Sequence, residues 1–208
     1  MRLRNIKGAR DVIKDTSFCI KEPENYKGRW NEEIFHNNNP IHVEIGMGKG
    51  KFIMELAMKN PDINYVGIEK YSSVLLRGIQ KMNAMEEPLS NLVFIRFDAE
   101  HITEIFGQEE IDKIYLNFSD PWPKARHEKR RLTSSPFLIK YDQIFKDQKH
   151  IVMKTDNRKL FEFSVISFVN YGYKIQDISL NLYDDELKDN IPTEYEIKFA
   201  SLGYPIYK

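Results

Sequence analysis

The chain has 208 residues, 41% hydrophobic and 30% charged, a composition that excludes a disordered chain and a membrane-spanning one. Its 31 basic and 31 acidic residues cancel, so net charge argues for no particular partner. Cys19 is the single cysteine, which excludes a disulfide framework and a thiolate zinc site and favours a reducing cytoplasm.

The basic N-terminus is followed by no apolar segment, so export is not expected. Residues 1–39 are predicted to form a basic arm and an edge helix, within the same domain as residues 40–208. Thereafter strands at 41–46, 63–69, 91–98, 111–118 and 150–156 alternate with helices at 50–60, 72–86, 100–106, 134–147 and 157–173. Two alternating segments, 174–183 and 193–202, are predicted to end the chain as a hairpin. The expected fold is α/β: a mostly parallel seven-stranded sheet with an antiparallel C-terminal strand and helices on both faces.

A glycine-rich turn, "VEIGMGKGKF", places Gly46, Gly48 and Gly50 directly after the first strand. It is not a P-loop, because Ile45 and Phe52 stand where glycine and Ser/Thr belong. The third glycine of a dinucleotide fingerprint is also missing. The spacing, with Glu44 before it, instead resembles the first motif of Rossmann-like S-adenosylmethionine methyltransferases. A ligand without a phosphate but with an ammonium group favours such a carboxylate.

Acids end the next two predicted strands. Glu69 can accept both ribose hydroxyls of an adenosine-containing ligand, and Asp98 can accept the adenine amine while Ala99 supplies a backbone N–H. After the fourth strand, "NFSDPWPK" resembles the Asp/Asn-Pro-Pro-aromatic motif of nucleobase methyltransferases. There Asp120 accepts hydrogen bonds, and Trp122 either stacks on the base or anchors the loop on the core.

Taken together, "VEIGMGKGKF", "GIEKY", "NFSDPWPKARHEKRRL", "KTDN" and "TEYEIKF" resemble the bacterial tRNA (guanine-N7)-methyltransferase family, in the family's order from Val43 to Phe199. The resemblance implies methyl transfer from S-adenosylmethionine to N7 of a guanine in the variable loop of tRNA. It implies cofactor contacts from Glu44, Gly46, Gly48, Glu69, Asp98 and Asp120, with Asp120 also the active-site acid. It further implies guanine contacts from Lys124, Asp156, Thr193, Glu194, Tyr195 and Glu196, and RNA contacts from Arg126, His127, Lys129, Arg130 and Arg131.

Two of these motifs have structural alternatives. Thr193 and Glu196 have capping-box spacing, but the alternation in "IKFASL" favours a strand that begins as a turn after Pro192. Asp156 has the position of a helix cap as well as that of a site residue.

No metal site is expected, because the five histidines show no paired ligand spacing. The chain is expected to act as a monomer or a homodimer. Two other functions stay open: a nucleic-acid-binding module on a decayed methyltransferase fold, and an NAD-dependent oxidoreductase.

Overall fold

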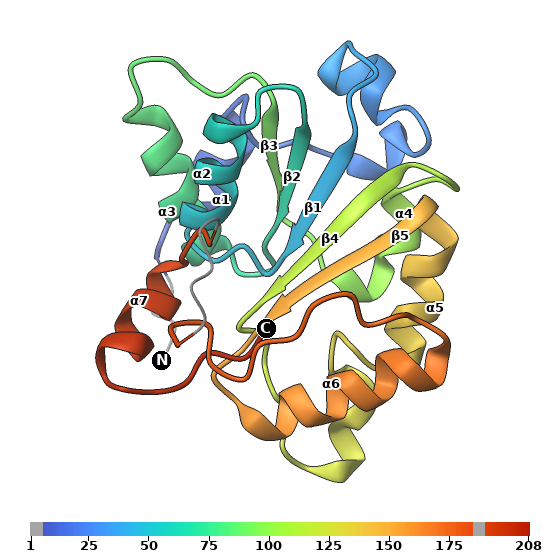
Figure 1. Ribbon diagram of the computed structural model, residues 1–208. Coiled ribbons are helices and arrows are strands. Elements are labelled where there is room, and N and C mark those ends of the chain that lie inside the picture. The colour runs from blue at the N-terminus through green and yellow to red at the C-terminus, as the bar shows by residue number, and fades with distance from the viewer. Residues whose placement is uncertain (1–5, 185–189) are drawn as a thin grey trace.

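The computed structural model describes residues 6–184 and 190–208, which form one sheet with helices on both faces (Figure 1). Arg2 and Arg4 of the predicted basic arm lie outside the described residues. The strands are β1 (Ile41–Ile45), β2 (Asn64–Ile68), β3 (Leu92–Ile95), β4 (Ile111–Asn117) and β5 (Phe145–Lys154). The α-helices are α1 (Ala9–Asp15), α2 (Lys51–Lys59), α3 (Ser72–Asn83), α4 (Ile102–Ile105), α5 (Ser135–Ile144), α6 (Arg158–Tyr171) and α7 (Glu194–Ser201). The 3₁₀ helices are η1 (Pro23–Tyr26), η3 (Ala99–His101) and η4 (Ala125–Arg130), and η2 (Asn31–Phe35) is a turn of π-helix.

The sheet has the strand order β3-β2-β1-β4-β5, and every neighbouring pair is parallel. The chain therefore adds β2 and β3 on one side of β1, and then crosses back to add β4 and β5 on the other side of β1. In doubly wound sheets, ligands bind beyond the carboxyl ends of the strands at this reversal. The predicted Rossmann-like architecture is confirmed.

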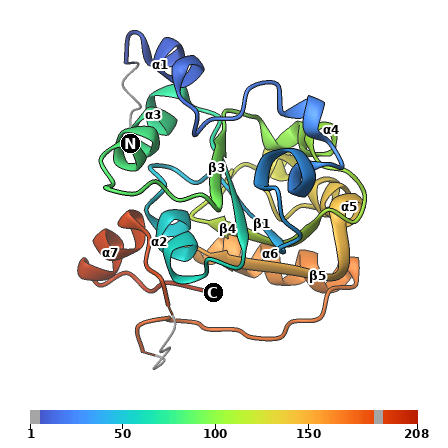
Figure 2. The same ribbon diagram turned by 90° about the horizontal axis from the view of Figure 1, so that it is seen from above.

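The two faces of the sheet bury different helices (Figure 2). Val43 and Ile45 of β1 and Leu116 of β4 belong to the core cluster that includes α4, α5 and α6. Tyr115 of β4 belongs to the other cluster, with α2 and α3. Since successive side chains of a strand alternate between faces, Glu44 and Asn117 lie on the α2 side.

The prediction of two further strands was wrong: the described residues hold five strands, not seven. Residues 174–183 contain no strand, and the segment expected to form a strand at 193–202 contains helix α7. Thr193 caps that helix, and Glu196 completes the capping box. The alternation in "IKFASL" misled because Ile197 is 46% exposed, so the pattern does not mark a buried sheet face.

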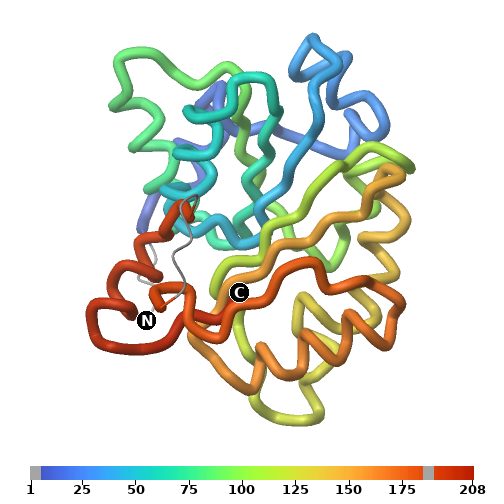
Figure 3. Tube along the Cα trace, viewed as in Figure 1, coloured from blue at the N-terminus to red at the C-terminus, as the bar shows by residue number. Residues whose placement is uncertain are grey.

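Antiparallel pairing does occur near β5, but it is formed by the last residues of the chain rather than by the predicted hairpin. Thr155 and Tyr207 exchange backbone hydrogen bonds of 3.0 and 2.8 Å in an isolated antiparallel bridge. Ser179 and Lys208 pair in the same way at 2.9 and 3.0 Å. Figure 3 shows the trace after α6 returning past β5 toward the C-terminus.

The N-terminal segment covers the β3 edge of the sheet. Helix α1 packs on α3, and Phe18 and Ile20, on either side of a parallel bridge from Cys19, form backbone hydrogen bonds with Phe94 of β3 at 2.8 and 2.9 Å. Farther along, Trp30 is fully buried and donates its indole N–H to the carbonyl of Ile105 at 2.7 Å. These contacts attach the segment to the sheet and to α4.

Candidate active site at the carboxyl ends of the strands

The predicted acids gather at one edge of the sheet. Glu44 lies near the end of β1, and Glu69, Asp98, Asp120 and Asp156 follow the ends of β2, β3, β4 and β5. Because all five strands are parallel, these loops emerge at the same edge. The sheet thus brings together residues that are far apart in the sequence.

The glycine turn leaves open space beside the end of β1. Gly46 and Gly48 have φ values of 78° and 60°, and a Cβ placed on either would meet nothing within 4 Å. The turn is tied to the next strand, because the Gly48 N–H donates to Glu69 Oε2 at 3.1 Å. The Tyr71 N–H donates to Glu69 Oε1 at 2.8 Å. Burial raises the pKa of Glu69, while these backbone donors oppose the rise.

Glu44 is the most buried of the five acids at the strand ends. It is 2% exposed, and its Oε1 accepts a hydrogen bond from Asn117 Nδ2 at 2.8 Å. Glu44 Oε2 and Asn117 Oδ1 are buried without a hydrogen-bond partner among the described residues. Burial raises the pKa of Glu44 to about 7, although the Asn117 hydrogen bond, the charge of Lys154 and the nearby Ile53 backbone N–H oppose the rise. Buried acceptors need hydrogen-bond donors, and a ligand ammonium group that enters beside the open glycine turn would supply them to these two oxygens. The residues therefore fit S-adenosylmethionine, which carries such a group.

Asp98 follows β3 and caps the short helix η3. Its Oδ1 accepts from the Glu100 N–H at 3.2 Å, and its Oδ2 accepts from Lys70 Nζ at 2.5 Å. Burial by itself would raise the pKa of Asp98, but these two hydrogen bonds and the charge of Lys70 together lower it by more than that. Ala99 is buried behind it. The acid is thereby held ionised, as an acceptor for an amine.

The loop after β4 is a strained turn that Arg131 braces. Phe118 and Trp122 have positive φ values of 52° and 42°, which non-glycine residues rarely adopt. Arg131 donates to the carbonyls of Pro121 and Trp122 at 3.1 and 3.2 Å, and its guanidinium lies 4.3 Å from the Phe163 ring centroid. This side chain is 13% exposed. Arg131, expected to contact RNA, is engaged within the chain.

Trp122 packs against its own loop and belongs to neither core cluster. The Arg130 guanidinium lies 4.9 Å from its ring centroid, and His127 meets it edge-on at 5.6 Å. Asp120 is exposed, and its charge contributes to the raised pKa of Glu69. The remaining predicted cations of this region are exposed: Lys124, Arg126 and Lys129. The loop therefore carries an acid whose charge acts on Glu69, and it presents cations to solvent.

Helix α7 brings the TEYE motif to the same edge. The Tyr195 hydroxyl lies 3.5 Å from Asp156 Oδ2, and its ring is 4.9 Å from that of Phe118. Glu194 forms ion pairs with Lys49, at 2.8 Å, and with Lys81. Glu194 and Tyr195 are exposed, whereas the Glu196 side chain is 0% exposed.

Sequence reasoning missed Asn117, Lys154 and the bracing role of Arg131. Asn117 and Lys154 face each other in the β4–β5 register at the ends of their strands. Each of these two residues is a polar residue at the end of a predicted strand, and that position could have indicated a site residue. Which of these residues meet depends on the strand order, which spacing alone does not supply.

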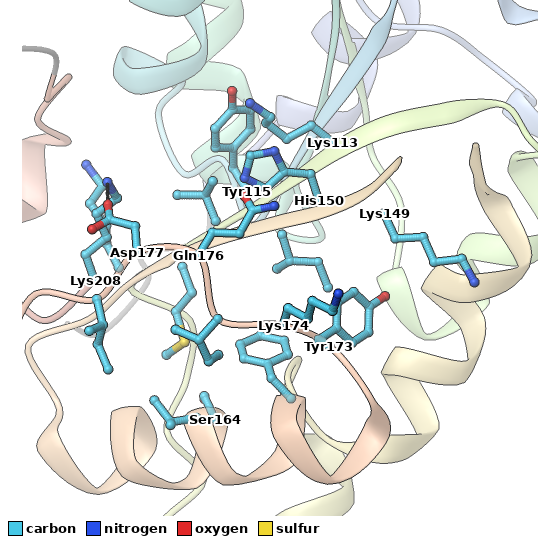
Figure 4. A pocket seen from close by; sticks show the side chains of 18 of the residues that line it. Lys113, Tyr115, Lys149, His150, Ser164, Tyr173, Lys174, Gln176, Asp177 and Lys208 are labelled. Carbon is cyan, nitrogen blue, oxygen red and sulfur yellow. Dashed lines mark hydrogen bonds and ion pairs between the residues drawn. The ribbon is translucent and has the colours of Figure 1, made fainter. Parts of the chain in front are cut away.

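A separate hollow lies away from the ends of the strands. A cavity of about 1190 Å³ opens between β5, α6 and the segment after α6, and Figure 4 shows His150, Lys174 and Gln176 among its lining residues. None of the predicted site residues lines it. The candidate site is therefore the edge at the strand ends, where charged groups and buried acceptors without a partner converge, and not this cavity.

Comparison with known proteins identifies the family of the chain. Residues 38–208 match a family described as putative methyltransferase. A tRNA (guanine-N(7)-)-methyltransferase of Lachnoclostridium phytofermentans is 56% identical over 100% of this chain and 96% of its own length. One from Bacillus subtilis is 48% identical over 100% of this chain and 97% of its own. The chain belongs to the tRNA (guanine-N(7)-)-methyltransferase family.

Solved structures of other methyltransferases share the fold of this family member. An antibiotic-related methyltransferase has a TM-score of 0.62 at 21% identity, covering 85% of this chain and 88% of that one. The 16S rRNA methyltransferase KamB has a TM-score of 0.62 at 15% identity, with the same coverage. Within residues 6–184 and 190–208, no helix is long and apolar enough to cross a membrane. The same residues hold no group of three or more His, Cys, Asp or Glu arranged to bind a metal ion.

Proposed function

We propose that the chain transfers a methyl group from S-adenosylmethionine to N7 of a guanine in the variable loop of tRNA. One observation supports the proposal most directly. The buried Glu44, one of whose oxygens has no hydrogen-bond partner, lies on β1 just before the glycine turn, and Asp120 follows the neighbouring strand β4, where the strand order reverses. The names of the full-length relatives supply the tRNA and the atom.

When bound, S-adenosylmethionine supplies an electrophilic methyl group on a sulfonium centre. Glu44 Oε2 would accept a hydrogen bond from its ammonium group, and Gly46 and Gly48 would allow the close approach that this requires. Glu69, fixed by two backbone donors, retains lone pairs for the ribose hydroxyls. Asp98 would accept a hydrogen bond from the adenine amine, and the Ala99 backbone N–H would donate to the ring.

Guanine N7 is an unprotonated nitrogen, so the reaction needs no general base to free its lone pair. The main task is to hold N7 in line with the methyl group. Positive charge moves onto the purine as the bond forms, and a carboxylate at 4 Å contributes about 4 kcal/mol at an effective dielectric of 20. Asp120, exposed in the braced loop, is the residue we assign to this role.

The nucleic acid is held from two sides. Asp156, Thr193, Glu194 and Tyr195 surround the target guanine together with Lys124, while exposed cations of the loop meet the phosphates. The active unit is a monomer or a homodimer. A tRNA substrate fits a cytoplasmic location.

Incubating the purified chain with tRNA and methyl-labelled S-adenosylmethionine, followed by mass spectrometry of the nucleosides, tests the reaction. We expect labelled 7-methylguanosine from the variable loop. Calorimetry should show binding of S-adenosylhomocysteine and not of NAD. A chain that bound neither but retained tRNA would be a nucleic-acid-binding module, and preference for NAD would indicate an oxidoreductase.

A further inference from the structure

A buried ion pair joins the end of β5 to helix α7. Lys154 Nζ lies 2.6 Å from Glu196 Oε2, and the two side chains are 3% and 0% exposed. Lys154 Nζ also donates to the Ile191 carbonyl at 2.8 Å and to Asn190 Oδ1 at 3.1 Å. Lys154 thus contacts both the segment just before α7, at Asn190 and Ile191, and the first turn of α7 itself.

The Glu196 carboxylate has no capacity left for a ligand. Its Oε2 accepts from Lys154 and, at 3.3 Å, from the Thr193 N–H. Its Oε1 accepts from Asn190 Nδ2 at 2.5 Å and from the Tyr183 hydroxyl at 3.5 Å. An ionised carboxylate offers about four lone-pair sites, and all four are used.

What the pair positions is the first turn of α7. The Glu196 N–H donates to Thr193 Oγ1 at 2.9 Å, which closes the capping box. One residue earlier, Tyr195 reaches Asp156 at 3.5 Å and packs 4.9 Å from Phe118. The turn therefore contacts the loops after β4 and β5, the two that flank the target guanine in the proposed function.

We propose that Lys154 and Glu196 are positioning residues that seat α7 at the active-site edge, and that Glu196 does not itself contact the guanine. The inference rests on the proposed function for the identity of the substrate. The guanine-facing groups of the motif are then Thr193, which is half-buried, and the exposed Glu194 and Tyr195. Removing either partner of a buried pair leaves a charge without its counter-ion, so the turn must shift or open.

The test compares Glu196→Gln, which is isosteric, and Lys154→Met with the parent chain. Both variants should exchange the α7 amides faster, notably the Ile197 N–H that bonds the Thr193 carbonyl. Single-turnover methylation of tRNA should fall about ten- to a hundredfold, as small misplacements of substrate groups do. The double variant should be no slower than the slower single variant, since the two residues act as one unit.

Glu162→Gln is the matched control, because it makes the same chemical change in an exposed ion pair with Arg158. The Glu162→Gln variant should change neither the hydrogen exchange of the α7 amides nor the rate of single-turnover methylation. If Glu196→Gln slows turnover while α7 stays as protected as in the parent, Glu196 contacts the guanine directly and the inference fails. Parental turnover in a folded variant would also overturn it.

Should Lys154→Met not fold, the isosteric Glu196→Gln variant decides the question by the same two measurements. An inactive parent chain would refute the proposed function instead. Hydrogen exchange would still show whether the pair seats α7, because it needs no substrate.

Discussion

Replacing Arg131 with methionine is predicted to loosen the loop after β4 without weakening the electrostatic attraction for tRNA. The guanidinium donates to the carbonyls of Pro121 and Trp122 at 3.1 and 3.2 Å while packing on Phe163. Methionine keeps an apolar side chain beside Phe163 but offers no donor. Because the side chain is only 13% exposed, solvent screens these interactions little.

The expected loss follows from the two hydrogen bonds. A bond from a charged donor contributes about 1.5–3 kcal/mol, and the freed carbonyls regain water. We therefore expect the free energy of unfolding to fall by about 1.5–3 kcal/mol rather than by twice that amount. Since Asp120 directly precedes the braced Pro121, single-turnover methylation should fall about ten- to a hundredfold.

The discriminating assay is the salt dependence of tRNA binding. Removing one cation that binds a phosphate flattens the plot of log affinity against log salt by about 0.7–0.9 of a unit. Arg130 is exposed, so Arg130→Ala should flatten the plot by that amount, whereas Arg131→Met should leave the slope as in the parent. Equal flattening by both substitutions would place Arg131 on the RNA and refute the bracing argument.

Three further predictions concern the acids of the site. Glu69→Ala should weaken S-adenosylhomocysteine binding by about 1.5–3 kcal/mol in calorimetry and leave tRNA binding nearly unchanged; unaltered cofactor affinity would remove Glu69 from the ribose. Asp120→Asn should keep the fold but slow single-turnover methylation about 10²–10³-fold, and a rate near that of the parent would exclude Asp120 from the reaction. In the cofactor-free chain the raised pKa of Glu44, about 7 against 4.5, means that the folded state binds more protons between these values. Stability should therefore fall by about 3 kcal/mol as pH rises from 4.5 to 7, and urea titrations of Glu44→Gln should lack this part of the fall.

Local chemistry determined much of the site in advance. The sequence places the glycine turn after a strand, and Gly46 and Gly48 do adopt positive φ there. It also puts Glu69 and Asp98 just beyond their strands, because short loops after parallel strands share one edge whatever the detailed packing. These features depend on neighbours in the chain, which is why spacing alone reveals them.

Tertiary structure decided the rest, because the relevant partners are remote in the sequence. Lys154 and Glu196 form their buried pair only when β5 and α7 are packed together, and this pair makes "TEYE" a helix cap rather than the start of a strand. Arg131, one of several similar cations in its segment, becomes a brace because the loop folds its carbonyls toward it. A charge pattern shows that cations are present, whereas the three-dimensional arrangement determines which of them face solvent.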